Sequence, residues 1–281
     1  MKSLVFIFII SSLTGCTSVF FQPQKNPYPV TFEKNINPVP FQIESFDHTP
    51  LSAWYFNSPK QPAKGLIVQF HGNGSNMTAA YQSVHWLTME GYDLVTFDFR
   101  GYGSTPGEPS MSEVYKDVFA AINYTNQLAK AKNIPLILLG QSLGGSLLLA
   151  ALEESHPSEL KAIVIEGSFY SYQQIAKEKL SISWVTRPFK FLASFLVSEM
   201  YSPGGKDKLE RLPRVPKILM YSEDDPVVPL HHGVQIFAEL KEPKYFWSHP
   251  EHGHINAFFV QGGKRRAELL TVLATYSVQP K

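Results

Sequence analysis

Residues 134–147 have the sequence Ile-Pro-Leu-Ile-Leu-Leu-Gly-Gln-Ser-Leu-Gly-Gly-Ser-Leu, an apolar run that leads into a glycine-rich turn and then a helical pattern. Gly140 and Gly144 leave room for the crowded backbone of a sharp strand-to-helix turn. Ser142 lies at the centre of that turn, where its hydroxyl would be exposed. Because the pattern Gly-x-Ser-x-Gly is common, its position between a buried strand and a helix is what makes Ser142 a candidate nucleophile.

The same succession of apolar run and helical pattern occurs along much of the chain. The predicted strands are residues 66–70, 94–97, 134–139, 162–165 and 218–221. The predicted helices are residues 79–90, 112–130, 143–154 and 230–240. Nearly continuous apolar strands that alternate with helices are typical of a mainly parallel sheet covered on both faces. The fold class is therefore predicted to be α/β.

Residues 169–205 depart from this alternation. The segment is aromatic and amphipathic, with Trp184, Phe189, Phe191 and Phe195, and it ends at Pro203-Gly204-Gly205. It is predicted to be a short helical cap inserted over the carboxyl edge of the sheet, where ligands bind in such folds.

Composition excludes several classes of protein. The chain has 281 residues, of which 44% are hydrophobic, so it is long enough for one large globular domain, expected over residues 41–281. The counts of basic residues (25) and acidic residues (24) nearly cancel, which gives no electrostatic reason to expect nucleic acid as a partner. A single cysteine excludes an internal disulfide framework and a cysteine-based zinc site.

The first forty residues have a different character. A lysine is followed by an apolar run over residues 4–13, too short to span a bilayer, so residues 1–15 are predicted to be a signal peptide. Leu13-Thr14-Gly15-Cys16 resembles the lipobox of bacterial lipoproteins, which implies cleavage before Cys16 and lipidation of its sulfur. In such lipoproteins an aspartate after the cysteine suggests retention in the inner membrane, so Thr17 at this position favours the outer membrane. The alternative is an ordinary signal peptide with an incidental cysteine. Residues 16–40 are rich in proline and are expected to form the lipidated N-terminus and a tether outside the core.

A serine nucleophile needs a base, and the base needs an orienting acid. In an architecture of this kind both are expected after later strands, the acid first and the histidine second. Asp225 follows the predicted strand 218–221 and precedes Pro-Val-Val-Pro, while Asp224 and Glu223 are its neighbouring alternatives. His254 begins a His-x-Asn step at an expected helix start and is preferred to His252.

Two further positions complete the predicted site. Hydrolysis through a tetrahedral intermediate requires N–H donors for the oxyanion. The loop His71-Gly72-Asn73-Gly74 follows the first strong strand, so the backbone N–H groups of Asn73 and Leu143 are the expected donors. The His71 side chain is expected to be structural.

Neither a metal nor a cofactor is expected. His249, His252 and His254 lie in one short loop without the His-Glu-x-x-His spacing of a zinc enzyme, and His249 is expected to be solvated. The glycine loop at residues 72–74 lacks the later glycine and the lysine of nucleotide-binding loops.

Taken together, residues 41–281 resemble the α/β-hydrolase superfamily, particularly the branch that includes Bem46-type and ABHD13- or ABHD17-type serine hydrolases. The matching motifs occur in the expected order: Phe70-His71-Gly72-Asn73, Asp98-Phe99-Arg100-Gly101-Tyr102-Gly103, Gly107-Glu108-Pro109, residues 140–144, Glu166-Gly167-Ser168-Phe169, Asp225 with Val227-Val228-Pro229, and His254. Asp98 and Arg100 are expected to organise loops.

The resemblance implies a lipid-anchored serine hydrolase of the bacterial cell envelope that cleaves carboxylic esters or thioesters with Ser142, Asp225 and His254. Its partners would be a small ester or acyl substrate and, through the lipid anchor, a membrane. A serine peptidase or amidase with the same triad, or a non-catalytic lipoprotein on a hydrolase scaffold, are the alternatives.

Overall fold

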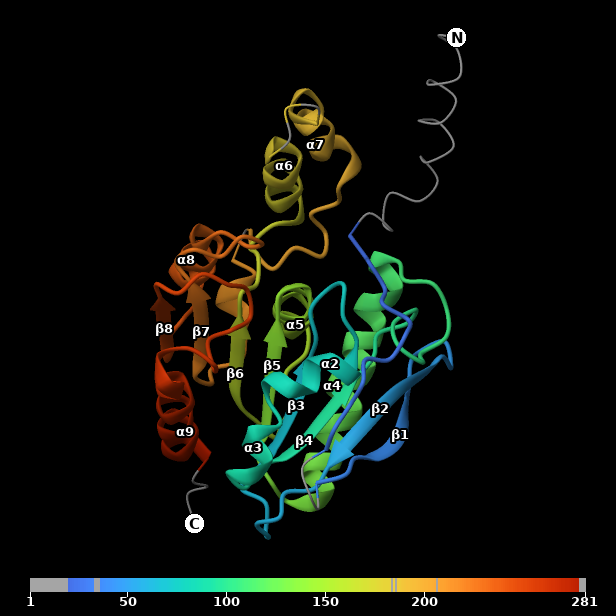
Figure 1. Ribbon diagram of the computed structural model, residues 1–281, viewed down its shortest axis with the longest axis vertical. Coiled ribbons are helices and arrows are strands. Elements are labelled where there is room, and N and C mark those ends of the chain that lie inside the picture. Colours follow the sequence, from blue (N-terminus) through green and yellow to red (C-terminus); the bar gives the residue numbers. More distant parts are fainter. Residues whose placement is uncertain (1–19, 33–35, 183, 185, 206, 278–281) are drawn as a thin grey trace.

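The computed structural model describes residues 20–32, 36–182, 184, 186–205 and 207–277, and within them one eight-stranded sheet forms the centre of the domain (Figure 1). Its order is β1-β2-β4-β3-β5-β6-β7-β8. The antiparallel strands β1 and β2 form one edge. The other six strands, β4-β3-β5-β6-β7-β8 in their order across the sheet, run parallel to one another. The strands are β1 (Val39–Glu44), β2 (Pro50–Phe56), β3 (Leu66–Phe70), β4 (Asp93–Phe97), β5 (Leu136–Gln141), β6 (Leu160–Glu166), β7 (Lys217–Ser222) and β8 (Lys244–His249). The predicted α/β-hydrolase fold is confirmed.

Both faces of the sheet are covered, which explains why its strands are apolar without alternation. In β5, Leu136 and Leu138 pack into one core cluster, and Ile137 and Leu139 pack into the other. The first cluster includes residues of α4 (Met111–Lys132), α5 (Leu143–Leu152) and α8 (Leu230–Glu239). The second includes residues of α3 (Trp86–Met89) and α9 (Lys264–Ser277).

The helix predicted over residues 79–90 is broken into α2 (Met77–Ala80), the 3₁₀ turn η1 (Tyr81–Ser83) and α3. In a continuous helix the carbonyl of Ala80 would accept from the N–H of Val84. Here that carbonyl instead accepts from Gln69 Nε2 and from Ser83 Oγ, both at 2.8 Å. The Val84 N–H turns to the carbonyl of Tyr81, so side-chain donors interrupt the helix.

The expectation of a tether outside the core is wrong for the described residues between 20 and 40. Phe21 and Ile36 are buried in the two core clusters. Asn76 Nδ2 donates to the carbonyls of Gln24 (3.0 Å) and Asn26 (2.9 Å), and β1 already begins at Val39. The prolines keep this segment extended, yet its backbone pairs with the loop around Asn76. The predicted signal peptide, residues 1–15, and Cys16 lie outside the described residues.

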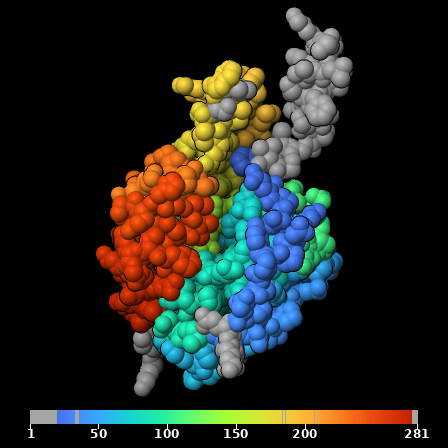
Figure 2. Space-filling model, in the orientation of Figure 1, coloured from blue at the N-terminus to red at the C-terminus, as the bar shows by residue number. Residues whose placement is uncertain are grey.

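Between β6 and β7 the chain leaves the sheet and forms the cap, which contains α6 (Tyr172–Ile182), η2 (Arg187–Leu192) and α7 (Ala193–Leu196). The cap stands beyond the carboxyl ends of the parallel strands and projects from the body of the domain (Figures 1 and 2). The chain returns through η3 (Leu209–Arg211), and η4 (Gln261–Gly263) precedes α9. In the part of the chain that the structure describes, no helix is both long and apolar enough to span a bilayer.

Replacing Gly144 by alanine is expected to destabilise the fold by about 3 kcal/mol, because a Cβ there would overlap the carbonyl oxygens of Phe70 and His71. Gly262→Ala is the matched control. Gly262 has a φ of 63°, but a Cβ added there would meet nothing within 4 Å, so only the backbone conformation is penalised, by about 1 kcal/mol. Denaturant unfolding measures both, and equal losses of stability would contradict the role of close packing at Gly144.

Candidate active site

Ser142 lies at the junction of β5 and α5 in a backbone conformation that L-residues rarely adopt, with φ 52° and ψ −121°. Its N–H donates to the carbonyl of Glu166 (2.8 Å), and its own carbonyl accepts from the N–H of Gly145 (3.1 Å). A Cβ on Gly140 would collide with the backbone of Gly145. Glycine is therefore required at position 140, where two parts of the backbone turn lie too close for a side chain. Ser142 lines a cavity beside this turn.

Asp225 and His254 form a hydrogen-bonded pair, and His254 lines the same cavity. His254 Nδ1 lies 2.7 Å from Asp225 Oδ2. The other carboxylate oxygen of Asp225 accepts from the N–H groups of Val227 (2.7 Å) and Val228 (2.9 Å). Since Nδ1 faces the carboxylate, Nε2 is the nitrogen left to act as a base, and both His254 and Ser142 line the cavity.

The neighbouring candidates form a separate pair. His252 Nδ1 lies 2.9 Å from Asp224 Oδ2, and the two side chains are 67% and 75% exposed. The Asp225 side chain, by contrast, is 1% exposed. The structure thus pairs each histidine with a different aspartate and leaves only His254 and Asp225 in the shielded environment that a catalytic pair needs.

Two expectations about these histidines are wrong. His249 is buried at the end of β8 instead of solvated, and burial lowers the pKa of its imidazole. His254 lies in a loop of turns before η4, not at a helix start, and the next residue, Ile255, has a φ of 57°. The local sequence does not predict the burial of His249 or the loop conformation at His254, because both arise from packing against segments that are distant in the sequence.

The loop after β3 packs directly on the turn that carries Ser142. A Cβ on Gly72 would lie 3.3 Å from Ser142 Cβ, and both Asn73 and Leu143 line the cavity. Leu143 is the first residue of α5, where N–H groups have no partner within the helix. The two residues expected to supply the oxyanion donors therefore line the same cavity as Ser142.

The side chain of Asn73 has a role that the sequence did not indicate. Its Oδ1 accepts from the N–H of Gln22 (2.8 Å) and from Tyr102 Oη (2.6 Å), while Nδ2 donates to the carbonyl of Phe20 (2.7 Å). These bonds hold the loop and the N-terminal segment together. His71 is structural as expected: it is fully buried, and burial lowers the pKa of its imidazole to about 4.

A buried row of amides and one carboxylate supports the site from beneath. Gln69 Nε2 donates to Gln141 Oε1, and Gln141 Nε2 donates to Glu166 Oε2, each at 2.8 Å. Glu166 Oε1 accepts from the N–H of Ala257 at 2.8 Å, three residues after His254. Burial raises the pKa of Glu166. In the sequence Glu166 stands out only as part of a motif, although a carboxylate at the end of an apolar strand is itself a signal of a buried role.

Asp98 and Arg100 are placed away from the cavity. The guanidinium of Arg100 donates to both carboxylate oxygens of Asp117, at 2.9 and 2.6 Å, and Asp98 Oδ1 accepts from the N–H of Met77 at 2.6 Å. Both residues hold loops, as expected from the sequence.

The cavity has a volume of about 740 Å³ and is mainly apolar. Of the described residues around it, Lys179 and His254 are the ionisable ones, and none is a carboxylate. Its apolar walls come largely from the cap: Ile175, Leu180, Phe189, Leu192, Leu196 and Val197.

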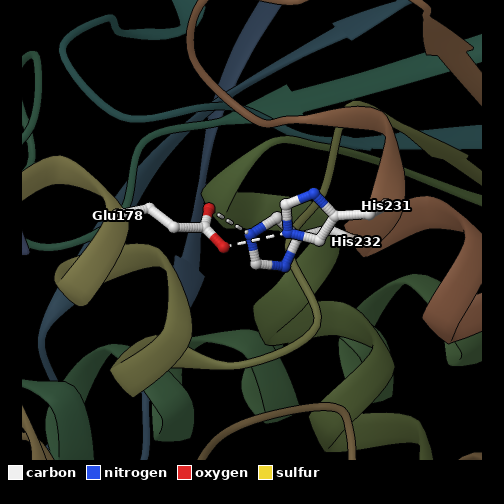
Figure 3. A group of neighbouring side chains, drawn as sticks. All are labelled: Glu178, His231 and His232. Atoms are coloured by element: carbon white, nitrogen blue, oxygen red, sulfur yellow. Dashed lines mark hydrogen bonds and ion pairs between the residues drawn. The ribbon is translucent and has the colours of Figure 1, made fainter. Parts of the chain in front are cut away.

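One group of side chains among the described residues could offer three ligands to a cation: Glu178 of α6 with His231 and His232 of α8 (Figure 3). Glu178 lies 2.9 Å from His231 Nε2 and 3.0 Å from His232 Nε2. However, His232 Nδ1 accepts from the N–H of Tyr170 at 3.2 Å. The neutral ring therefore carries its proton on Nε2 and donates it to Glu178, so the group fits a hydrogen-bonded contact between cap and body better than a metal site.

If the backbone at Ser142 is strained, Ser142→Gly should be more stable than Ser142→Ala by about 1 kcal/mol, because glycine accepts this φ and ψ without cost. The usual ranking in and around helices is the reverse. Urea unfolding of the two variants tests the point, and an alanine variant at least as stable as the glycine variant would contradict it.

Known proteins with similar sequences indicate the family of this chain. Residues 61–208, just over half of the chain, match the family model described as "Serine aminopeptidase, S33". The uncharacterized protein YfhR of Escherichia coli K12 is 27% identical over 98% of this chain and 95% of its own length. The lysophosphatidylserine lipase ABHD12 of Mus musculus is 27% identical over 68% of this chain and 51% of its own length.

Solved structures resemble the fold at low identity. A soluble variant of monoglyceride lipase from Saccharomyces cerevisiae matches with a TM-score of 0.70 and 18% identity, over 90% of this chain and 100% of that one. The esterase Pf2001 of Pyrococcus furiosus matches with a TM-score of 0.68 and 17% identity, over the same shares. With the fold, the serine turn and the family model in agreement, the chain belongs to the α/β-hydrolase superfamily, in the family described as serine aminopeptidase, S33.

Proposed function

We propose that the protein is a serine hydrolase that cleaves carboxylic esters or thioesters through an acyl-enzyme. The observation that carries this proposal is the 2.7 Å contact of Asp225 with His254, which lines the same cavity as Ser142. A serine on a strained turn, a base whose orientation is set by a shielded carboxylate, and free N–H groups beside the serine are the parts that acyl transfer requires.

In this mechanism Ser142 Oγ attacks the acyl carbon as His254 Nε2 takes its proton. Asp225 orients the imidazole and stabilises the charge that forms on it. The backbone N–H groups of Asn73 and Leu143 bind the oxyanion, and the protonated His254 gives its proton to the leaving alcohol or thiol. A water molecule then hydrolyses the acyl-enzyme by the same steps and restores Ser142.

The walls of the cavity favour an apolar acyl group. An aminopeptidase binds the charged α-amino group of its substrate, and a carboxylate is the usual partner for such a group. None of the described residues around the cavity supplies one, whereas the cap contributes an apolar surface. The relatives and structural neighbours that are named as lipases and an esterase support the same choice over the peptidase suggested by the family's description.

We further propose that Cys16 is lipidated after cleavage of residues 1–15 and that the protein is anchored in the bacterial cell envelope, at the outer membrane. The resemblance of residues 13–16 to a lipobox and the threonine at position 17 support this. On the motifs quoted above we assign the chain to the branch that includes Bem46-type hydrolases.

Hydrolysis of nitrophenyl esters with acyl chains from two to sixteen carbons tests the proposed chemistry. The protein should be active, and Ser142→Ala should lose at least about a thousandfold in kcat, because the attacking oxygen is removed. An apolar cavity of this size predicts an optimum above two carbons. Full activity in folded Ser142→Ala would refute the assignment, and a wild-type protein that reacts with no ester or acyl probe would favour the non-catalytic lipoprotein.

The choice of triad partners is tested by matched substitutions of neighbours. His254→Ala and Asp225→Ala should each lower kcat by about a hundredfold or more, because the base or its orientation is lost. His252→Ala and Asp224→Ala remove an exposed pair of the same two residue types and should change kcat less than about threefold. The assignment is wrong if the exposed pair proves the more sensitive one.

A further inference from the structure

The tip of the cap carries large apolar side chains that no described segment covers. Trp184 is 85% exposed, Phe195 80% and Ile182 75%, and Phe191 is also exposed. Scattered apolar residues on a surface need no explanation, but such a density within one short insertion marks a binding surface. Together with the exposed Arg187 and Lys190 among them, these residues form the cap face. The cap projects from the rest of the molecule (Figure 2).

The charges of the cap face are cationic. Arg187 and Lys190 are exposed within it, and Ile182, Lys190 and Phe191 line one shallow groove. Glu178 lines the same groove, but over residues 172–199 four basic side chains (Lys177, Lys179, Arg187 and Lys190) outnumber the two carboxylates (Glu178 and Glu199), so the cap has a net positive charge. An apolar surface with a net positive charge is complementary to the headgroups and acyl chains of an anionic bilayer.

The cap face is continuous with the wall of the cavity. Phe189 and Leu196 line the cavity and are themselves 54% and 43% exposed, so apolar surface extends from the inside of the cap to its outside. A partner that covers the cap face would therefore also lie beside the opening of the cavity.

The described N-terminal segment begins at the cavity, a few residues after Cys16. Phe20 lines the cavity and its ring packs on Tyr172 of α6, 5.2 Å between ring centroids. Cys16 is four residues earlier, and a fully extended chain of that length spans no more than ~14 Å. An anchor at Cys16 would hold the opening of the cavity within that distance of a lipid surface.

We propose that the cap face docks on the surface of an anionic phospholipid bilayer and that the cavity opens onto the lipid. Ile182, Trp184, Phe191 and Phe195 insert among the acyl chains, while Arg187 and Lys190 contact lipid phosphates. An acyl ester then passes from the membrane into the cavity without crossing water. This last step rests on the proposed hydrolase function, whereas the docking itself does not.

The test uses the full chain with Cys16→Ser, so that no acyl chain on the protein contributes. Vesicles of phosphatidylcholine with or without phosphatidylglycerol carry brominated acyl chains, which quench nearby indoles. Trp184 should be quenched on the anionic vesicles, and Trp184→Phe should remove that part of the signal. Quenching reports contact of the cap with the acyl chains, which attachment through the N-terminus alone does not produce.

Phe195→Ser should weaken binding to the anionic vesicles about tenfold, because an aromatic ring that inserts is lost. Met89→Ser removes a residue that is 42% exposed at the end of α3 and should change binding less than about twofold. Phe195 does not line the cavity, so hydrolysis of a short water-soluble ester by Phe195→Ser should equal that of the wild type.

Three results would overturn the proposal. The first is bound protein whose Trp184 emission is unquenched, and the second is equal binding by Phe195→Ser and Met89→Ser. The third is a dimer in solution that shields Trp184, which would assign the cap face to a second copy of the chain. Failure of the proposed hydrolase function has a different signature, since vesicle binding would persist while no ester is cleaved.

Discussion

The close backbone contact between the β5–α5 turn and the end of β3 is the constraint on which the site depends. Gly144 lies so near the carbonyls of Phe70 and His71 that no side chain fits, and the chain reverses at Ser142 with a φ of 52°. The same contact brings the loop of Gly72 against Ser142, so it positions both the proposed nucleophile and the residues expected to supply the oxyanion donors. Parallel strands then deliver Asp225 and His254 to the same edge of the sheet.

The cavity above this turn is built from segments far apart in the sequence. The cap supplies its apolar walls and is held to α8 through Glu178, His231 and His232 (Figure 3). The N-terminal segment closes another side through Phe20, which is fixed by Asn73. Because the side chain of Asn73 bonds the N-terminal segment and Asn73 itself lines the cavity, the position of that segment and of the loop after β3 are linked.

Local sequence was sufficient for the features with short-range causes. Strand runs, the serine turn and the helices α4, α5 and α8 follow from periodicity and glycine spacing, and the fold class follows from their order. For the pairings of Asp225 with His254 and of Asp224 with His252, the sequence could only rank the candidates, since the pairings depend on side-chain directions in two loops. The burial of Phe21, the interrupted helix at Tyr81–Ser83 and the bond from Ala257 to Glu166 arise between distant segments and have no local signature.

The central claim is that Ser142 is an activated nucleophile, and locating a covalent adduct tests it most directly. A fluorophosphonate phosphonylates a serine oxygen as a neighbouring base takes the hydroxyl proton and fluoride leaves, and peptide mass spectrometry identifies the labelled residue. We expect one adduct, on Ser142, with labelling slowed in His254→Ala and unchanged in His252→Ala. Folded protein that stays unlabelled, or that is labelled at another serine, would contradict the claim.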